Sequence, residues 1–111
     1  MLLICAALFG ALTLSANAAE SLGTFRVGAR SSNNHMIDAR VREQWVTVEG
    51  QGATDLDCWL YDDSKQLVDS DTDTTDYCVL STTGAGRYRL VVRNKGQVAT
   101  TYVVRKLERL R

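Results

Sequence analysis

Apolar residues recur at every second position in several short stretches of this chain. In Arg87–Arg93, for example, Tyr88, Leu90 and Val92 alternate with arginines and one valine. Leu56–Tyr61 has the same pattern. Because successive side chains of a strand point to opposite faces, this spacing predicts strands with one buried face. No window shows the apolar stripe of an amphipathic helix.

Turn-forming residues separate these stretches. Examples are Gly50-Gln51-Gly52, Asp62–Lys65, Thr82–Gly86 and Asn94-Lys95-Gly96. Short strands divided by such turns predict an all-β fold, a small antiparallel β-sandwich or barrel with about seven to eight strands. We also expect a polar turn at Ser31–His35, and a loop or exposed strand end at Asp69–Asp76.

The first residues have the character of an export signal. Leu2–Ala16 is almost entirely apolar or small, and Ala16-Asn17-Ala18 fits the small-x-small cleavage rule. The run is shorter than the roughly 20 residues that cross a bilayer. We therefore predict a signal peptide over 1–18, a periplasmic or secreted mature chain, and no membrane span after cleavage. An uncleaved anchor and a lipoprotein through Cys5 are the alternatives.

Removal of the signal leaves Cys58 and Cys78 as the cysteines of the mature chain. An even pair in an exported protein predicts a disulfide, with two buried free thiols as the alternative. A closed loop of about 20 residues would stabilise the fold by roughly 3 kcal/mol. A metal pair is disfavoured because no CxxC motif or nearby histidine adds further ligands.

The net charge is zero, yet the charges are segregated. Aspartates dominate 55–76, whereas arginine and lysine dominate 87–111. Such asymmetry is typical of a binding face. The simpler interpretation, which we favour, is that the two regions face each other or solvent, and nucleic acid is not expected as a partner.

Part of the acidic region has the ligand type that Ca²⁺ prefers, since this ion takes six to eight oxygens. Alternate spacing would turn neighbouring aspartates to one side, and convergence of two such groups would form a calcium site. The candidate ligands, called here the acidic set, are Asp55, Asp57, Asp69, Asp71 and Asp73. An EF-hand is excluded by Thr74 and Leu80 at its glycine and glutamate positions. The alternative is a solvated loop in which aspartates make local turns.

Catalytic signals are weak, whereas two aromatic residues suggest binding. His35 is the only histidine and lies in a polar stretch, where we expect it at the surface. No GxSxG motif is present. We therefore predict that the protein is not an enzyme, with a small hydrolase as a remote alternative.

Trp59 and Tyr61 lie opposite the apolar face of their strand, where exposed rings would stack on sugars or peptides. The alternative is that this face is covered.

The order of several motifs resembles a known family. The motifs are Thr54-Asp55-Leu56-Asp57, Leu60-Tyr61-Asp62, the acidic stretch before Cys78, Gly86-Arg87-Tyr88 and Val91–Asn94. Together they resemble the bacterial pre-peptidase C-terminal (PPC) domain, over roughly Gln44–Val104. The resemblance implies a jelly-roll-like β-sandwich, an exported setting and a non-catalytic role, with calcium in some relatives. On this basis 44–105 would be the sandwich core, 19–43 a lead-in with one or two strands, and 106–111 a basic tail.

The function that follows is an exported, non-catalytic binding or accessory module, with calcium ordering the acidic loop. Its partner would be a protein or a glycan outside the cytoplasm. The alternative is a structural or protein-interaction domain that takes no small ligand.

Overall fold

The computed structural model describes residues 19–40, 44–52 and 54–108. The predicted signal peptide lies outside these ranges. The described residues form eight strands and no helix, which confirms the all-β prediction. The strands are β1 (Ala19–Val27), β2 (Ser32–Ala39), β3 (Gln44–Gly50), β4 (Leu56–Tyr61), β5 (Leu67–Asp71), β6 (Tyr77–Ser81), β7 (Gly86–Asn94) and β8 (Thr100–Glu108). Within the described ranges, no helix of a length and apolarity suited to crossing a bilayer occurs.

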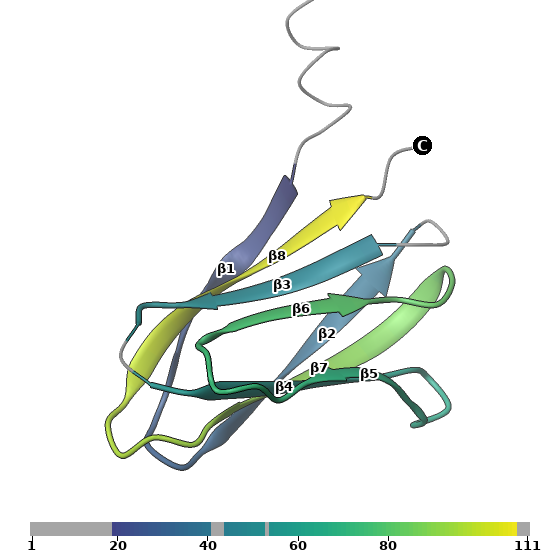
Figure 1. The fold of residues 1–111 in the computed structure, drawn as a ribbon. Coiled ribbons are helices and arrows are strands. Elements are labelled where there is room, and N and C mark those ends of the chain that lie inside the picture. Colours follow the sequence, from purple (N-terminus) through teal and green to yellow (C-terminus); the bar gives the residue numbers. More distant parts are fainter. Residues whose placement is uncertain (1–18, 41–43, 53, 109–111) are drawn as a thin grey trace, which may run out of the picture.

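The strands form two four-stranded antiparallel sheets that face each other (Figure 1). Sheet A has the order β1-β8-β3-β6, and sheet B has the order β2-β7-β4-β5. Thus the first strand pairs with the eighth, the second with the seventh, the third with the sixth and the fourth with the fifth. This order arises when one long hairpin rolls up into a jelly roll, so the predicted jelly-roll-like sandwich is confirmed.

The core lies between the two sheets and contains the residues that alternate along the strands. β4 and β7 contribute the apolar residues whose period predicted them. The fully or nearly fully buried core residues of these strands and of β3, β6 and β8 are Val46, Val48, Leu56, Cys58, Leu60, Cys78, Leu80, Tyr88, Leu90, Val92, Tyr102 and Val104. Removal of this apolar surface from water is the main force that holds the sheets together.

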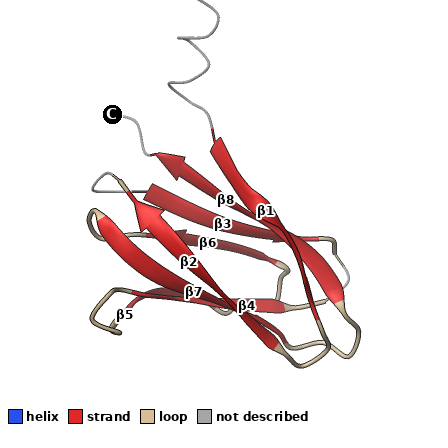
Figure 2. Ribbon diagram, turned by 180° about the vertical axis from the view of Figure 1, so that it is seen from behind, coloured by secondary structure: helices blue, strands red, loops and turns tan. Residues whose placement is uncertain are grey.

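The first two strands are full members of the sandwich rather than a lead-in (Figure 2). β1 pairs with β8, and β2 pairs with β7 from Ser32 opposite Arg93 to Ala39 opposite Gly86. The predicted turn at Ser31–His35 is therefore wrong, because most of it lies in β2. The turn comes earlier, where Arg30 has a φ of 55°. Edge strands tolerate polar residues on their open side, and this composition resembled a turn.

The last strand extends further than the expected boundary at residue 105. β8 continues to Glu108, so Lys106 belongs to the sheet and not to a basic tail. Its side chain is buried, and its Nζ donates to the backbone oxygen of Asp38 at 2.5 Å and lies 3.6 Å from Oε1 of Glu20. The long aliphatic stem lets a charged residue cross apolar surface to reach these partners. Residues 109–111 lie outside the described part of the chain.

Candidate functional site

The predicted disulfide is present and joins the two sheets. Cys58 of β4 and Cys78 of β6 are bonded, and their Cα atoms are 6.3 Å apart. Both residues are fully buried. Because β4 belongs to sheet B and β6 to sheet A, the bond holds the two sheets together next to Asp57 and Asp71 of the acidic set.

Two members of the acidic set accept hydrogen bonds from the open edge of β6. β5 and β6 are the edge strands of opposite sheets. Oδ2 of Asp69 accepts the backbone N–H of Ser81 at 2.8 Å, and Oδ2 of Asp71 accepts that of Val79 at 2.9 Å. An edge strand has unpaired N–H groups that need acceptors. Asp69 and Asp71 supply these acceptors, so each gives one carboxylate oxygen to the edge of β6.

A second group of acidic residues lies at the start of β4. Oδ1 of Asp55, Oδ1 of Asp57 and Oγ1 of Thr54 are buried, and none has a hydrogen-bond partner among the described residues. The other carboxylate oxygen of Asp57 lies 3.5 Å from Nζ of Lys95. Burial raises the pKa of Asp57, Lys95 opposes this effect, and the charge of Asp55 adds to it. Buried oxygens without partners are unfavourable unless another group satisfies them.

Asp73 is an exposed neighbour of this group. Its Oδ1 accepts hydrogen bonds from the N–H and the hydroxyl of Thr75 at 3.0 and 2.7 Å, and these bonds lower the pKa of Asp73. Its charge also contributes to the raised pKa of Asp57. In the described part of the chain, no group of three or more histidine, cysteine or acidic residues has a metal-binding arrangement. The oxygens of Thr54, Asp55 and Asp57 nevertheless match the hard-oxygen chemistry of Ca²⁺.

Trp59 and Tyr61 lie on the outer face of sheet B, as their spacing predicted. Cross-strand pairing places them in two rows, Met36–Arg89–Tyr61–Leu67 and Asn34–Val91–Trp59–Ser70. The rings are half-buried, whereas Met36 and Leu67 are 58% and 53% exposed. The guanidinium of Arg89 lies 4.9 Å from the centre of the Tyr61 ring, which is a cation–π contact.

We call this surface the arginine–aromatic face. It comprises Met36, Trp59, Tyr61, Leu67, Arg87, Arg89, Val91 and Arg93. Arg87 forms an exposed ion pair with Asp38, at 3.4 Å. Arg89 and Arg93 instead approach neutral oxygens, Oδ1 of Asn34 at 3.4 Å and Oγ of Ser32 at 3.5 Å.

Among the described residues, no arginine of β7 forms an ion pair with an aspartate of the acidic region, whereas Lys95 does. Asp57 lies opposite Arg93 in the strand register, but its carboxylate approaches Lys95. Asp69 and Asp71 bind the edge of β6. The two charged regions therefore meet through Asp57 and Lys95, whereas the arginines of β7 remain outside this pairing.

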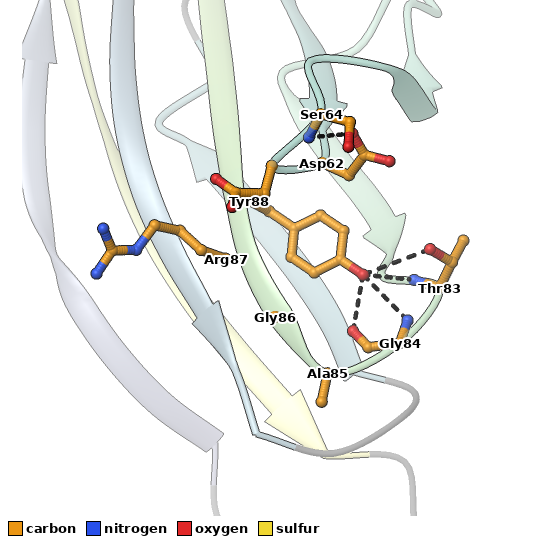
Figure 3. A pocket seen from close by; sticks show the side chains of 9 residues that line it. Asp62, Ser64, Thr83, Gly84, Ala85, Gly86, Arg87 and Tyr88 are labelled. Carbon is orange, nitrogen blue, oxygen red and sulfur yellow. Dashed lines mark hydrogen bonds between the residues drawn. The ribbon is translucent and has the colours of Figure 1, made fainter.

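A shallow pocket lies at one end of β7 (Figure 3). Its volume is about 280 Å³, and Asp62, Ser64, Arg87 and Tyr88 are among its lining residues. The hydroxyl of Tyr88 donates to the carbonyl of Gly84 at 2.7 Å and accepts the N–H of the same residue at 3.0 Å. The Gly-x-Tyr motif thus anchors the loop before β7, and this ring has a structural role.

His35 lies between the sheets rather than at the surface, so that prediction is wrong. It is half-buried on β2, and its ring centre is 4.3 Å from that of Phe25. Nε2 is 2.6 Å from the hydroxyl oxygen of Tyr102, which also accepts a hydrogen bond from Asn33 at 2.9 Å. Burial lowers the pKa of His35 and raises that of Tyr102. This contact could have been predicted only if residue 35 had been known to lie on the inward face of a strand.

No family model matches the sequence, and no curated protein matches it. Solved structures do match the fold. A pre-peptidase C-terminal domain of a collagenase from Bacillus anthracis is 13% identical, with a TM-score of 0.56 over 76% of this chain and 87% of that one. The likeness of fold to the PPC domain, expected from the motifs, is therefore confirmed.

Two further solved structures share the sandwich. A periplasmic inhibitor of g-type lysozyme from Aeromonas hydrophila is 10% identical, with a TM-score of 0.57 over 84% of this chain and 88% of that one. A mitogen from Yersinia pseudotuberculosis is 9% identical, with a TM-score of 0.60 over 84% and 87%. At these identities the likeness concerns the fold alone.

Proposed function

We propose that this protein is an exported, non-catalytic binding module that acts through the arginine–aromatic face. The observation that carries the proposal is the combination of Trp59, Tyr61 and Arg89 with exposed Met36 and Leu67 on one sheet face. Tryptophan, tyrosine, arginine and methionine are the residues enriched in protein interfaces. Because they stand on neighbouring strands, they are held in place before a partner arrives, which lowers the entropic cost of binding.

Export and a non-catalytic role are supported by separate observations. The Cys58–Cys78 disulfide favours an oxidising compartment, such as the periplasm or the exterior. The periplasmic inhibitor with the same fold is consistent with that location. His35, a candidate for acid–base chemistry, is hydrogen-bonded to the hydroxyl group of Tyr102 between the two sheets.

We further propose that Ca²⁺ stabilises the start of β4. Thr54, Asp55 and Asp57 would hold the ion through their buried oxygens, and Asp73 is the nearby carboxylate whose charge already acts on Asp57. Asp69 and Asp71 are excluded from this proposal because the edge of β6 occupies them. A bound cation would supply positive charge to carboxylates that burial otherwise disfavours.

Site-specific photo-cross-linking tests the binding role. A photoreactive amino acid at Met36 or Leu67 probes the arginine–aromatic face, and the same residue at Val79 probes the exposed outer side of sheet A. We expect discrete cross-linked products from the first two positions in cells that make the protein, and none from Val79. Equal labelling from all positions, or from Val79 alone, would contradict the proposal.

A further inference from the structure

We infer that the arginine–aromatic face recognises a protein that presents carboxylates among apolar side chains. This inference rests on the proposed binding role and names the chemistry of its partner. It follows from the charges that the face leaves without a partner, from the apolar residues at its ends, and from the way in which Arg89 is held.

The arginines of the face carry charge that is only partly paired. Among the described residues, no carboxylate lies within ion-pair distance of Arg89 or Arg93, whose guanidinium groups donate hydrogen bonds to Asn34 and Ser32. Arg87 has Asp38, but both side chains are more than 60% exposed, and exposed pairs exchange readily with other partners. The outer side of sheet B carries Arg87, Arg89 and Arg93 against the carboxylates of Asp38 and Asp57, so its positive charge is only partly paired. A planar guanidinium is well suited to bind a carboxylate through two hydrogen bonds.

Three aspartates of the acidic region are not available to Arg89 and Arg93, because they have other contacts. Asp69 and Asp71 accept N–H groups of β6, and Asp57 lies at Lys95. Asp62 and Asp63 line a hollow with Arg87 and Arg89 but form no ion pair there among the described residues. Arg89 and Arg93 can therefore still bind carboxylates of another molecule.

The exposed apolar side chains of the face favour a protein partner over an anionic polysaccharide. Met36 and Leu67 occupy the two ends of the row that contains Arg89 and Tyr61, and both are more than half exposed. Apolar side chains gain by removal from water, and only a partner with apolar groups of its own supplies that gain. A central arginine and aromatic pair flanked by apolar residues is also the usual composition of the energetically dominant part of a protein interface.

Arg89 is held in position before a partner binds. Its guanidinium lies over the Tyr61 ring, in the middle of the row and not at its margin. A side chain that is already positioned loses less conformational entropy when it binds. Arg89 is therefore the residue whose charge should contribute most to affinity.

Peptide selection tests this inference without a known partner. A pool of random peptides displayed on phage is selected against the oxidised full chain, and the recovered peptides are synthesised. Their affinities are then measured for the wild-type protein, for Arg89→Glu and for Arg26→Glu. Arg26 is an exposed arginine of β1 on the other sheet, so its variant has the same net charge and serves as the matched control.

We expect peptides rich in aspartate or glutamate beside leucine, methionine or phenylalanine. Arg89→Glu should weaken their binding by about tenfold or more, as expected for the loss of a close charge pair, whereas Arg26→Glu should leave it nearly unchanged. Binding should also weaken as salt is raised. If Arg89→Glu does not fold, as judged by circular dichroism, Arg89→Gln replaces it.

Several results would overturn the inference. They are recovery of neutral or basic peptides, no enrichment at all, an equal loss in Arg26→Glu, and an Arg89-dependent affinity for heparin greater than that for the peptides. Arg89-dependent self-association in analytical ultracentrifugation would assign the face to a second copy of this chain and would overturn it as well. If cross-links form from Met36 and Leu67 but the peptides are not acidic, only the partner's chemistry is wrong. If no cross-links form, the binding role itself fails.

Discussion

Asp71 of β5 accepts the backbone N–H of Val79 of β6 at 2.9 Å, although the two strands belong to different sheets. Asp69 makes the equivalent bond to Ser81 one step along. These carboxylates replace the neighbouring strand that β6 lacks on this side. These two acidic side chains therefore connect the edge strands of the two sheets, in addition to carrying surface charge.

This relationship predicts the effect of removing Asp69. The Asp69→Ala variant should lower the free energy of unfolding by about 1–2 kcal/mol, because a charged acceptor of a partly buried N–H is lost. Urea denaturation measures the change. Asp63→Ala, an exposed aspartate in the turn between β4 and β5, is the matched control and should change stability by less than about 0.5 kcal/mol. Equal effects in the two variants would show that the edge contact contributes nothing.

The disulfide should contribute more than either aspartate. A variant with both Cys58→Ala and Cys78→Ala should lose roughly 3 kcal/mol, since the bond closes a loop of 20 residues in the unfolded chain. The denaturation midpoint of this variant should match that of the reduced wild-type protein. If the oxidised wild type and the variant unfold at the same urea concentration, the cross-link does not stabilise the sandwich.

The half-buried His35 predicts a dependence of stability on pH. Burial lowers the pKa of His35 from its ordinary value of 6.5, and its contacts, Phe25 and Tyr102, are uncharged. The unfolded chain therefore binds the proton more tightly than the folded one. Its contribution to stability is complete above the unfolded value and is lost as the pH falls through the folded pKa.

Unfolding free energies measured from about pH 7.5 to pH 5.5, on either side of the ordinary histidine pKa, test this expectation. The wild type should lose stability toward the lower end, and His35→Gln should lose much less. A parallel decline in both proteins would assign the dependence to other groups. Asp57, whose pKa is raised by burial, acts in the opposite direction, because its contribution is lost as the pH rises.

The proposed cation site predicts a specific effect of Ca²⁺ on thermal stability. A ligand that binds only the folded state at about a hundredfold excess over its Kd adds about 2.7 kcal/mol. In a domain of this size, that corresponds to an increase in Tm of roughly 10 °C. The increase should be reversed by EDTA, absent in Asp55→Asn, and retained in Asp63→Asn. An unchanged Tm in the wild type would remove calcium from the proposed function.

The contrast between His35 and Leu60 shows which parts of the fold were readable in advance. Leu60 belongs to an apolar series of period two, and the structure buries it as expected. His35 lies in Ser-Asn-Asn-His, whose composition is that of a turn. Its strand forms because β7 lies beside it, so no local property of those residues could reveal the pairing.

In the candidate site, too, some features followed from the local sequence and others only from strand pairing. The outward position of Trp59 and Tyr61 followed from alternation along β4, whereas the contact of Arg89 with Tyr61 depends on the register between β4 and β7. Asp55 and Asp57 remain as a pair at the start of β4, but Asp69 and Asp71 turn to β6. Which acceptor meets which donor is decided across strands that are distant in the sequence.

The sequence by itself determined the all-β class, the disulfide and the inward residues of β4 and β7, because alternation and cysteine number are local or countable properties. Only the tertiary structure decided that β1 and β2 complete both sheets, that Asp69 and Asp71 close an edge, and that His35 is internal. The physical reason is that each of these depends on the strand lying opposite. In a jelly roll, that strand is often far away along the chain.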